Sequence, residues 1–133
     1  MLETTKGSNQ TPNIKWAPNF IFTIPENKSR MLLYYTGITR TAKNILGEIV
    51  RGMFLNENIN TSILNDIKIH ATDTFNILQS GNFEEYCKCI QHTWKQKQQL
   101  DIGTNPPEVQ KIIHLIKDYT SCLLYTSPSP RDS

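Results

Sequence analysis

The 133-residue sequence lacks the marks of several large protein classes. Its three cysteines are too few for a disulfide framework. No apolar run approaches the roughly 20 residues of a membrane span, and Met1–Thr4 has neither the basic nor the apolar region of a signal peptide. A formal net charge of +2 gives no reason to expect a nucleic-acid partner. These absences predict a cytoplasmic protein with no membrane or nucleic-acid partner.

Residues that bind metals or act as nucleophiles are also sparse. His70, His92 and His114 are far apart in the sequence and lack the spacing of a metal site. Cys87 and Cys89 should point to opposite sides of a helix, which suits neither zinc nor redox chemistry. No Ser/His/Asp set is evident. We therefore predict no metal site, and we assign no catalytic residue.

The first third of the chain contains short apolar, aromatic and β-branched runs that are typical of strands. Met31–Thr36 is an apolar run of strand length, and we expect a buried strand that ends at Gly37. Met1–Thr5 has the character of a strand end, but nothing precedes it to pair with. The shorter elements expected between them are strands at Ile14–Trp16 and Phe20–Thr23 and a charged turn at Glu26–Arg30.

Four helices should follow, because apolar residues then recur every three or four positions. They are expected at about 42–54, at Thr61–Ser80, from Asn82 onward and from Asn105 onward. Asn82 and Glu85 form a capping box, Gly81 ends the second helix, and Asn105 caps the fourth. The expected apolar faces are Leu64, Ile67, Ala71, Phe75 and Leu78 on the second helix, and Phe83, Cys87, Ile90 and Trp94 on the third. The pattern predicts an α+β fold, with a few short strands followed by about four helices.

Composition changes abruptly near the C-terminus. Cys122–Asp132 matches, residue for residue, one translated frame of a common transposase sequencing adapter. We therefore divide the chain into a strand-rich segment at 1–40, a helical segment at 41–120 and an adapter-like tail at 121–133. The tail is expected to lie outside the fold.

Two motifs carry a resemblance to known enzymes. Leu33–Lys43 contains Tyr-Thr-Gly-Ile-Thr-Arg, which resembles the YTGxxR junction in the C-terminal half of fucokinases and heptose-phosphate kinases. The stretches Thr93–Asp101 and Gly103–Pro107 look like the fucokinase form of the next motif. Leu2–Thr120 therefore resembles the C-terminal region of GHMP-superfamily sugar kinases, and L-fucokinases and bifunctional fucokinase/fucose-1-phosphate guanylyltransferases in particular.

The resemblance implies part of a two-domain kinase. Such an enzyme binds ATP and Mg²⁺ and transfers the γ-phosphoryl group to the anomeric hydroxyl of L-fucose. The Gly/Ser-rich nucleotide loop and the aspartate base are expected in the N-terminal kinase domain, which would be the intramolecular partner of this chain. A second Gly-rich loop is expected just after Thr120. The chain is accordingly expected to be inactive alone, with ATP and the sugar bound only by its parent.

Residues suited to substrate binding lie at the junction between the expected strand and helix. Thr36, Gly37, Thr39 and Arg40 are placed where free backbone N–H groups and the helix dipole favour anionic or hydroxyl-rich ligands. Gly37 permits close approach of the backbone, and Arg40 can pair with a phosphate or a sugar hydroxyl. The alternative is that the two threonines cap the helix and Arg40 forms a surface ion pair.

Trp94 and Lys97 are further candidates for substrate binding. The indole can stack on a sugar face, and the lysine can reach a pocket. The alternative is that Trp94 belongs to the core and Lys97 extends along its surface.

Two other functions remain open. A heptose-phosphate kinase fragment shares the junction motif. A non-enzymatic helical binding module would instead pack its apolar faces against a partner protein.

Overall fold

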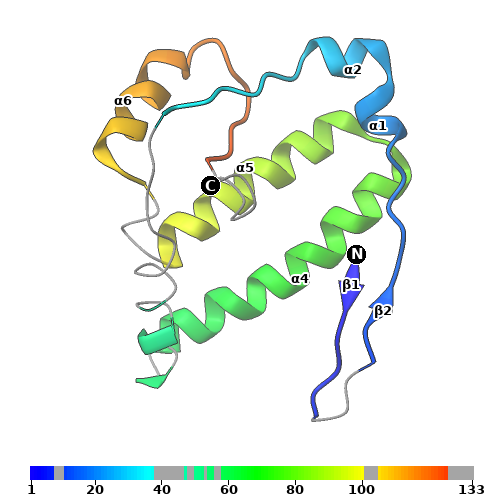
Figure 1. Cartoon of the computed structure of the whole chain (residues 1–133), viewed down its shortest axis with the longest axis vertical. Coiled ribbons are helices and arrows are strands. Elements are labelled where there is room, and N and C mark those ends of the chain that lie inside the picture. The colour runs from blue at the N-terminus through cyan, green and yellow to red at the C-terminus, as the bar shows by residue number, and fades with distance from the viewer. Residues whose placement is uncertain are drawn as a thin grey trace.

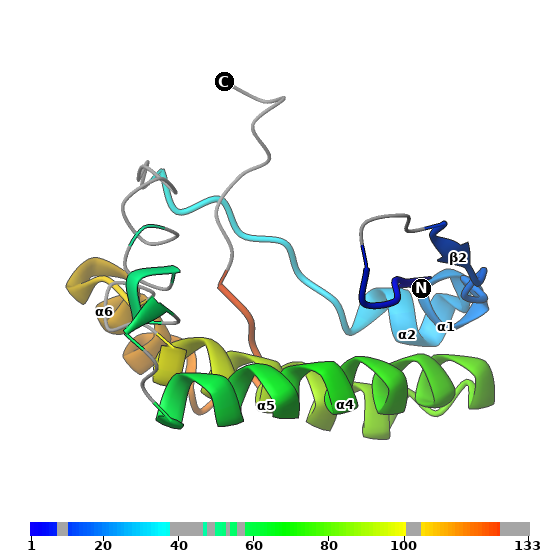
Figure 2. The ribbon, with the colours of Figure 1, turned by 90° about the horizontal axis from the view of Figure 1, so that it is seen from below.

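The computed structural model describes residues 1–7, 11–37, 47, 50–52, 54–55, 58–100 and 105–125. Within these ranges the elements are β1 (Leu2–Glu3), β2 (Asn13–Ile14), α1 (Phe20–Thr23), α2 (Pro25–Ser29), α4 (Asn58–Ser80), α5 (Phe83–Leu100) and α6 (Pro107–Ile116). This α+β arrangement agrees with the predicted class. The two longest helices, α4 and α5, run side by side as a layer, and the strands, α1 and α2 lie over one side of it (Figures 1 and 2). The helix expected at 42–54 falls mostly outside the described residues.

The α4–α5 hairpin confirms the predicted helix boundaries. Gly81 joins the helices with φ +72°, a left-handed conformation that ends α4, and its N–H donates to the carbonyl of Ile77 at 3.1 Å. The side-chain oxygen of Asn82 then accepts a hydrogen bond from the backbone N–H of Glu85 at 3.1 Å, as the capping box predicts. Short-range sequence signals are therefore sufficient to define this turn.

The buried side of α4 largely follows the predicted stripe, since four of its residues are half-buried, namely Leu64, Ile67, Phe75 and Leu78. Ala71 is exposed, although it was expected to face the core, whereas Ile63 is buried and His70 is half-buried. His70 hydrogen-bonds to α5. The error arose because the polar histidine was not counted as an interface residue.

Three predictions for the first third of the chain were wrong. Met31–Thr36 forms no strand, and Leu33 is 98% exposed, because the described sheet consists of β1 and β2 alone and does not pair with this segment. Phe20–Thr23 is the helical turn α1, and most of the expected turn at Glu26–Arg30 lies in α2. Pro25 occupies the first turn of α2, where its missing N–H costs no helical hydrogen bond.

The N-terminal segment does have a pairing partner, contrary to expectation. β1 and β2 are antiparallel, with Leu2 opposite Ile14 and Glu3 opposite Asn13. The Nζ of Lys15 lies 2.8 Å from a carboxylate oxygen of Glu3. The prediction failed because it sought a partner before the segment rather than after it.

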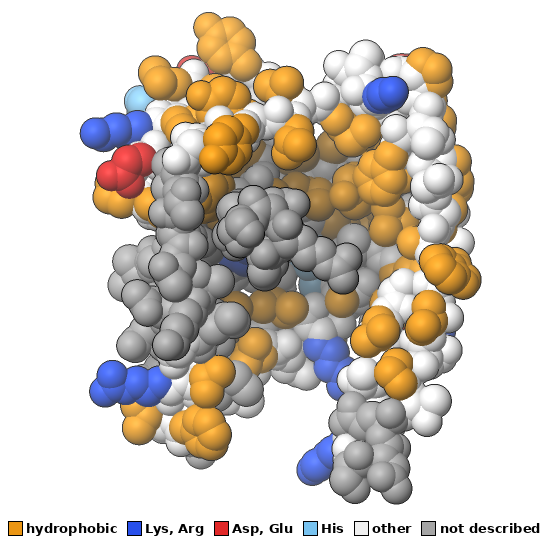
Figure 3. Space-filling model, viewed as in Figure 1, with side chains coloured by type: hydrophobic (Ala, Val, Ile, Leu, Met, Phe, Trp, Pro, Cys, Tyr) orange, Lys and Arg blue, Asp and Glu red, His pale blue; other side chains and the backbone are white. Residues whose placement is uncertain are grey.

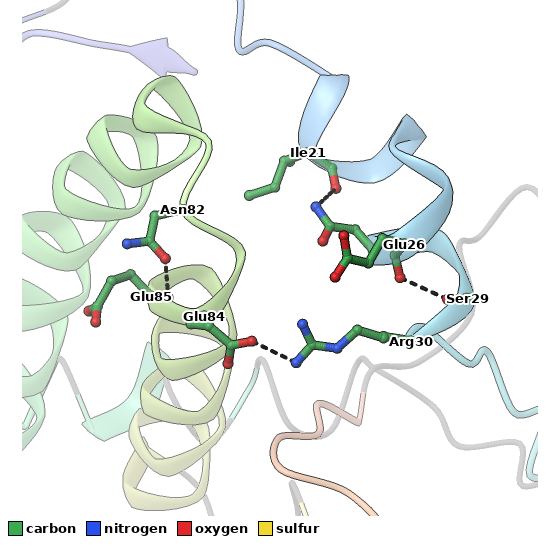
Figure 4. A network of polar contacts seen from close by, with 8 residues as sticks. Ile21, Glu26, Ser29, Arg30, Asn82, Glu84 and Glu85 are labelled. Atoms are coloured by element: carbon green, nitrogen blue, oxygen red, sulfur yellow. Dashed lines mark hydrogen bonds and ion pairs between the residues drawn. The ribbon is translucent and has the colours of Figure 1, made fainter.

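Helices α1 and α2 are held to each other and to α5. The side-chain amide of Asn27 donates to the carbonyl of Ile21 at 2.9 Å, and Ile21 is fully buried (Figure 4). Phe22 packs edge-on against Tyr86 of α5, with ring centroids 5.2 Å apart. Arg30 reaches Glu84 of α5 from the end of α2. The short helices therefore form a small unit that caps the turn end of the hairpin.

Apolar side chains are prominent on the surface. Figure 3 shows them gathered over much of the face viewed. Among the described residues, six large ones are at least 80% exposed, namely Trp16, Leu32, Leu33, Tyr35, Phe54 and Tyr119. No helix within the described ranges has the length and hydropathy to cross a membrane.

Candidate functional site

The described part of the strand-to-helix junction consists of Thr36 and Gly37. Gly37 has φ +69°, which glycine adopts at low cost, and a Cβ there would meet nothing within 4 Å. Glycine is therefore required for the backbone turn rather than for close packing. Thr36 is half-buried. Thr39 and Arg40 lie outside the described residues.

Trp94 and Lys97 are three positions apart on α5 and so lie on one side of the helix. Trp94 is only 7% exposed, and its ring meets the edge of Tyr125 at a centroid distance of 6.4 Å. Lys97 is half-buried. The burial of Trp94 favours a packing role, while ligand binding by either residue stays a prediction.

Residues 121–125, the described part of the adapter-like tail, lie against α5. Burial and then the neighbouring thiol of Cys122 raise the pKa of Cys87 to about 11. Tyr125 covers part of Trp94. The pKa of Cys87 and the covering of Trp94 thus depend on a segment that was expected to lie outside the fold.

The hairpin contains a polar cluster that sequence spacing did not reveal. His70 on α4 and His92 on α5 are in edge contact, with ring centroids 4.6 Å apart. The Nε2 of His70 lies 3.0 Å from the carbonyl oxygen of Cys89 and 3.1 Å from Oγ1 of Thr93. Since a carbonyl only accepts, Nε2 carries the proton and donates. Two histidines that are 22 positions apart in sequence therefore meet because the hairpin is antiparallel.

Two buried amides lack partners within the described part of the chain. Gln96 on α5 is 4% exposed, and neither its Nε2 nor its Oε1 has a hydrogen bond. The Oδ1 of Asn105 is likewise buried and unpaired. Asn105 was expected to cap α6, but the N-cap is Pro106, and no side chain caps the helix. The prediction failed because the Pro106–Pro107 pair starts the helix one residue later.

The unpaired amide of Gln96 is a polar signal inside the hairpin. A buried amide without a partner costs about 1–3 kcal/mol, and amides also bind sugar hydroxyls. Sequence reasoning missed Gln96 because an isolated glutamine in a polar helix gives no pattern. Gln96 and Trp94 point to different sides of α5, because residues two positions apart are separated by about 200° around a helix. The structure therefore does not gather the candidates into one site.

Comparison with known proteins gives a relative. No protein-family model matches the chain. It is 51% identical over 120 residues, or 90% of its length, to L-fucokinase/L-fucose-1-P guanylyltransferase from Bacteroides fragilis, and it spans 13% of that protein's length. The resemblance to bifunctional fucokinase/fucose-1-phosphate guanylyltransferases is thereby confirmed.

Proposed function

We propose that this chain, a relative of one segment of the bifunctional L-fucokinase/L-fucose-1-P guanylyltransferase, belongs to the kinase part of such a protein. The identity of 51% over 120 residues carries the proposal. The kinase part is favoured because the junction at Thr36–Arg40 resembles that of GHMP-superfamily sugar kinases. The proposed parent reaction transfers the γ-phosphoryl group of ATP to the anomeric hydroxyl of L-fucose.

The chain's contribution is to position substrate rather than to react. Phosphoryl transfer depends largely on alignment and on stabilisation of charge. In the proposed role, the turn at Gly37 directs the following residues toward the substrates, and Arg40 binds a phosphate or a sugar hydroxyl. Thr36 and Thr39 supply hydroxyl groups at the same junction. Trp94 and Lys97 are kept as weaker substrate-binding candidates.

ATP and Mg²⁺ are assigned to the parent protein. The nucleotide supplies the phosphoryl group, and the metal neutralises its charge. Within the described ranges, no group of three or more His, Cys, Asp or Glu side chains is arranged to hold a metal. We therefore assign none of the described residues to Mg²⁺. We propose that the nucleotide loop and the base lie in other parts of the parent, and that this chain is inactive alone.

The direct test measures phosphorylation of L-fucose with ATP and Mg²⁺, following the sugar phosphate by phosphorus NMR. The full 133-residue chain is expected to give no turnover above buffer. The intact Bacteroides fragilis relative serves as the positive control. Turnover by the purified chain would refute the inactive-segment proposal.

A graft tests the site residues. The matching 120 residues of the relative are replaced by those of this chain, and Arg40→Ala is compared with Arg51→Ala, a matched change at an exposed arginine. Arg40→Ala should lower kcat/KM about tenfold or more, the effect of losing a charge-assisted hydrogen bond. Equal activity of the two variants would remove Arg40 from the site.

A heptose-phosphate kinase remains the second candidate, because the junction motif is shared. Offering the grafted protein a heptose phosphate and L-fucose in parallel separates the two. A higher kcat/KM for the heptose phosphate would replace the fucokinase proposal.

A further inference from the structure

We infer that Met31–Tyr35, which forms no strand in the described chain, becomes a β-strand when it pairs with a sheet edge supplied by the rest of the parent protein. The inference rests on the proposed function in one respect, namely that the sheet belongs to the parent kinase. It concerns an interaction surface and its occupant, not the reaction.

The side chains of this segment are apolar or aromatic and are turned to solvent. Leu32 and Leu33 are 89% and 98% exposed, and Tyr34 and Tyr35 are 65% and 80% exposed. A contiguous apolar patch of this kind on a protein surface marks an interaction site.

Beyond Met31, the backbone of the segment has no partner either. The N–H of Met31 closes the last turn of α2 on Lys28. From Leu32 to Tyr35, no hydrogen bond joins the backbone to any described residue. In Figures 1 and 2 the segment runs as an open trace from α2 toward the end of the molecule that carries α6. Such a row of free N–H and C=O groups is what a strand offers to a sheet edge.

The pattern of side chains identifies the kind of partner. Successive residues of a strand point to opposite faces. Leu33 and Tyr35 would occupy one face and Leu32 and Tyr34 the other, so both faces are apolar. Strands with two apolar faces lie inside sheets that are covered on both sides. The partner is therefore a sheet with a layer on each face.

This chain does not offer such a sheet to a second copy. The sheet within its described residues consists of β1 and β2, each two residues long, which is shorter than Met31–Tyr35. The chain spans 13% of the length of its relative, so most of that protein lies outside the segment and is available to provide the sheet. The parent protein is therefore favoured as the source of the sheet that pairs with Met31–Tyr35.

Backbone amide exchange tests the inference. It is measured for Met31–Tyr35 in the full chain alone and in the grafted relative. Exchange should be fast in the lone chain and on the order of 100-fold slower in the graft. Equally fast exchange in both would overturn the inference. So would slow exchange in the lone chain accompanied by a dimer mass, since a second copy would then be the occupant.

Matched proline variants of the graft test the backbone pairing. Leu33→Pro removes an N–H from the strand, while Lys6→Pro changes an exposed residue near the N-terminus. Leu33→Pro should lower the yield of folded protein and the protection of neighbouring amides, and Lys6→Pro should not. Equal effects would contradict the inference. Where the graft itself does not fold, amide exchange is measured at the aligned residues of the intact relative. Slow exchange there supports the inference, and fast exchange contradicts it.

These readouts do not depend on activity. A protected strand in a protein that phosphorylates no sugar would support the inference and refute the proposed function. An active kinase in which the amides of this segment stay unprotected would refute the inference and support the proposed function.

Discussion

Arg30 at the end of α2 and Glu84 in the first turn of α5 form an ion pair of 2.6 Å across 54 positions of sequence. Hydrogen bonding to Glu84 is the main cause that raises the pKa of the Arg30 guanidinium. The guanidinium also lies 4.9 Å from the ring centroid of Phe83. These contacts link the N-terminal helices to the hairpin.

Removing this ion pair should loosen α2 without unfolding the hairpin. In Glu84→Gln, the amide of Arg30, which donates to Asn27 in the last turn of α2, should exchange faster. Glu85→Gln is the matched control, because Glu85 pairs with Lys88 on the same helix. The global melting temperature should change little in either variant, since exposed ion pairs contribute little to stability. Equal exchange in both variants would show that the pair does not hold α2.

Loss of the α5 cap should destabilise the hairpin. Asn82→Ala removes the acceptor of the Glu85 N–H and is expected to lower the free energy of unfolding by about 1 kcal/mol. Urea unfolding followed by circular dichroism measures the change. Asn76→Ala, at an exposed position within α4, should be neutral or slightly stabilising. If Asn76→Ala lowered the free energy of unfolding by as much as Asn82→Ala, the lost cap would not be the cause of the destabilisation.

Gly81→Ala should cost more than Gly37→Ala. Both glycines have positive φ, so each alanine pays a backbone cost of about 1–2 kcal/mol. A Cβ at Gly81 would also come within 2.7 Å of Cζ of Phe20, whereas one at Gly37 meets nothing. The difference between the two variants therefore measures the contact with Phe20. It should shrink when Gly81→Ala is made in a Phe20→Ala background, and a constant difference would count against the contact.

Deleting residues 121–133 should expose Trp94. Tyr125 then no longer meets the indole ring. Acrylamide quenching of Trp94 fluorescence, measured in a Trp16→Phe background because Trp16 is 87% exposed, should become stronger. Unchanged quenching would show that the ring is covered by other parts of the chain.

The same deletion should make Cys87 more reactive in mild alkali. Its pKa is raised from 9.0 to about 11, first by burial and then by Cys122. The folded chain therefore holds the proton that the unfolded chain has lost, so this contribution to stability is complete below about pH 9 and disappears toward pH 11. After deletion, alkylation of Cys87 monitored by mass spectrometry should rise at lower pH. Cys122→Ala should give a smaller shift, because most of the burial remains.

The turn between α4 and α5 was predictable because its signals are local. The end of α4 and the start of α5 follow from Gly81 and Asn82, whose conformation and hydrogen bond depend on a few neighbouring residues. The strand-rich part was not, because a strand is defined by its partner. Met31–Thr36 has the composition of a buried strand, yet it forms no strand within the described chain.

The candidate site was less predictable than the helices. Motif resemblance indicated the correct relative. It gave no indication of the positive φ that the structure shows at Gly37, where only close approach of the backbone had been predicted. The motif resemblance could not reveal Gln96, whose unpaired amide depends on how α5 is buried. Nor could it show that His70 and His92 meet, because that contact depends on the register of two helices.

The hydrogen bond from His70 to α5 has a consequence for how the two long helices can slide. The carbonyl oxygen of Cys89 lies 3.0 Å from Nε2 of His70 and also accepts a hydrogen bond from Oγ1 of Thr93 at 3.0 Å. A slide of α4 along α5 by one helical turn, about 5.4 Å, would carry the imidazole beyond hydrogen-bonding distance of both partners. One backbone oxygen therefore helps to hold the two helices at a single axial position.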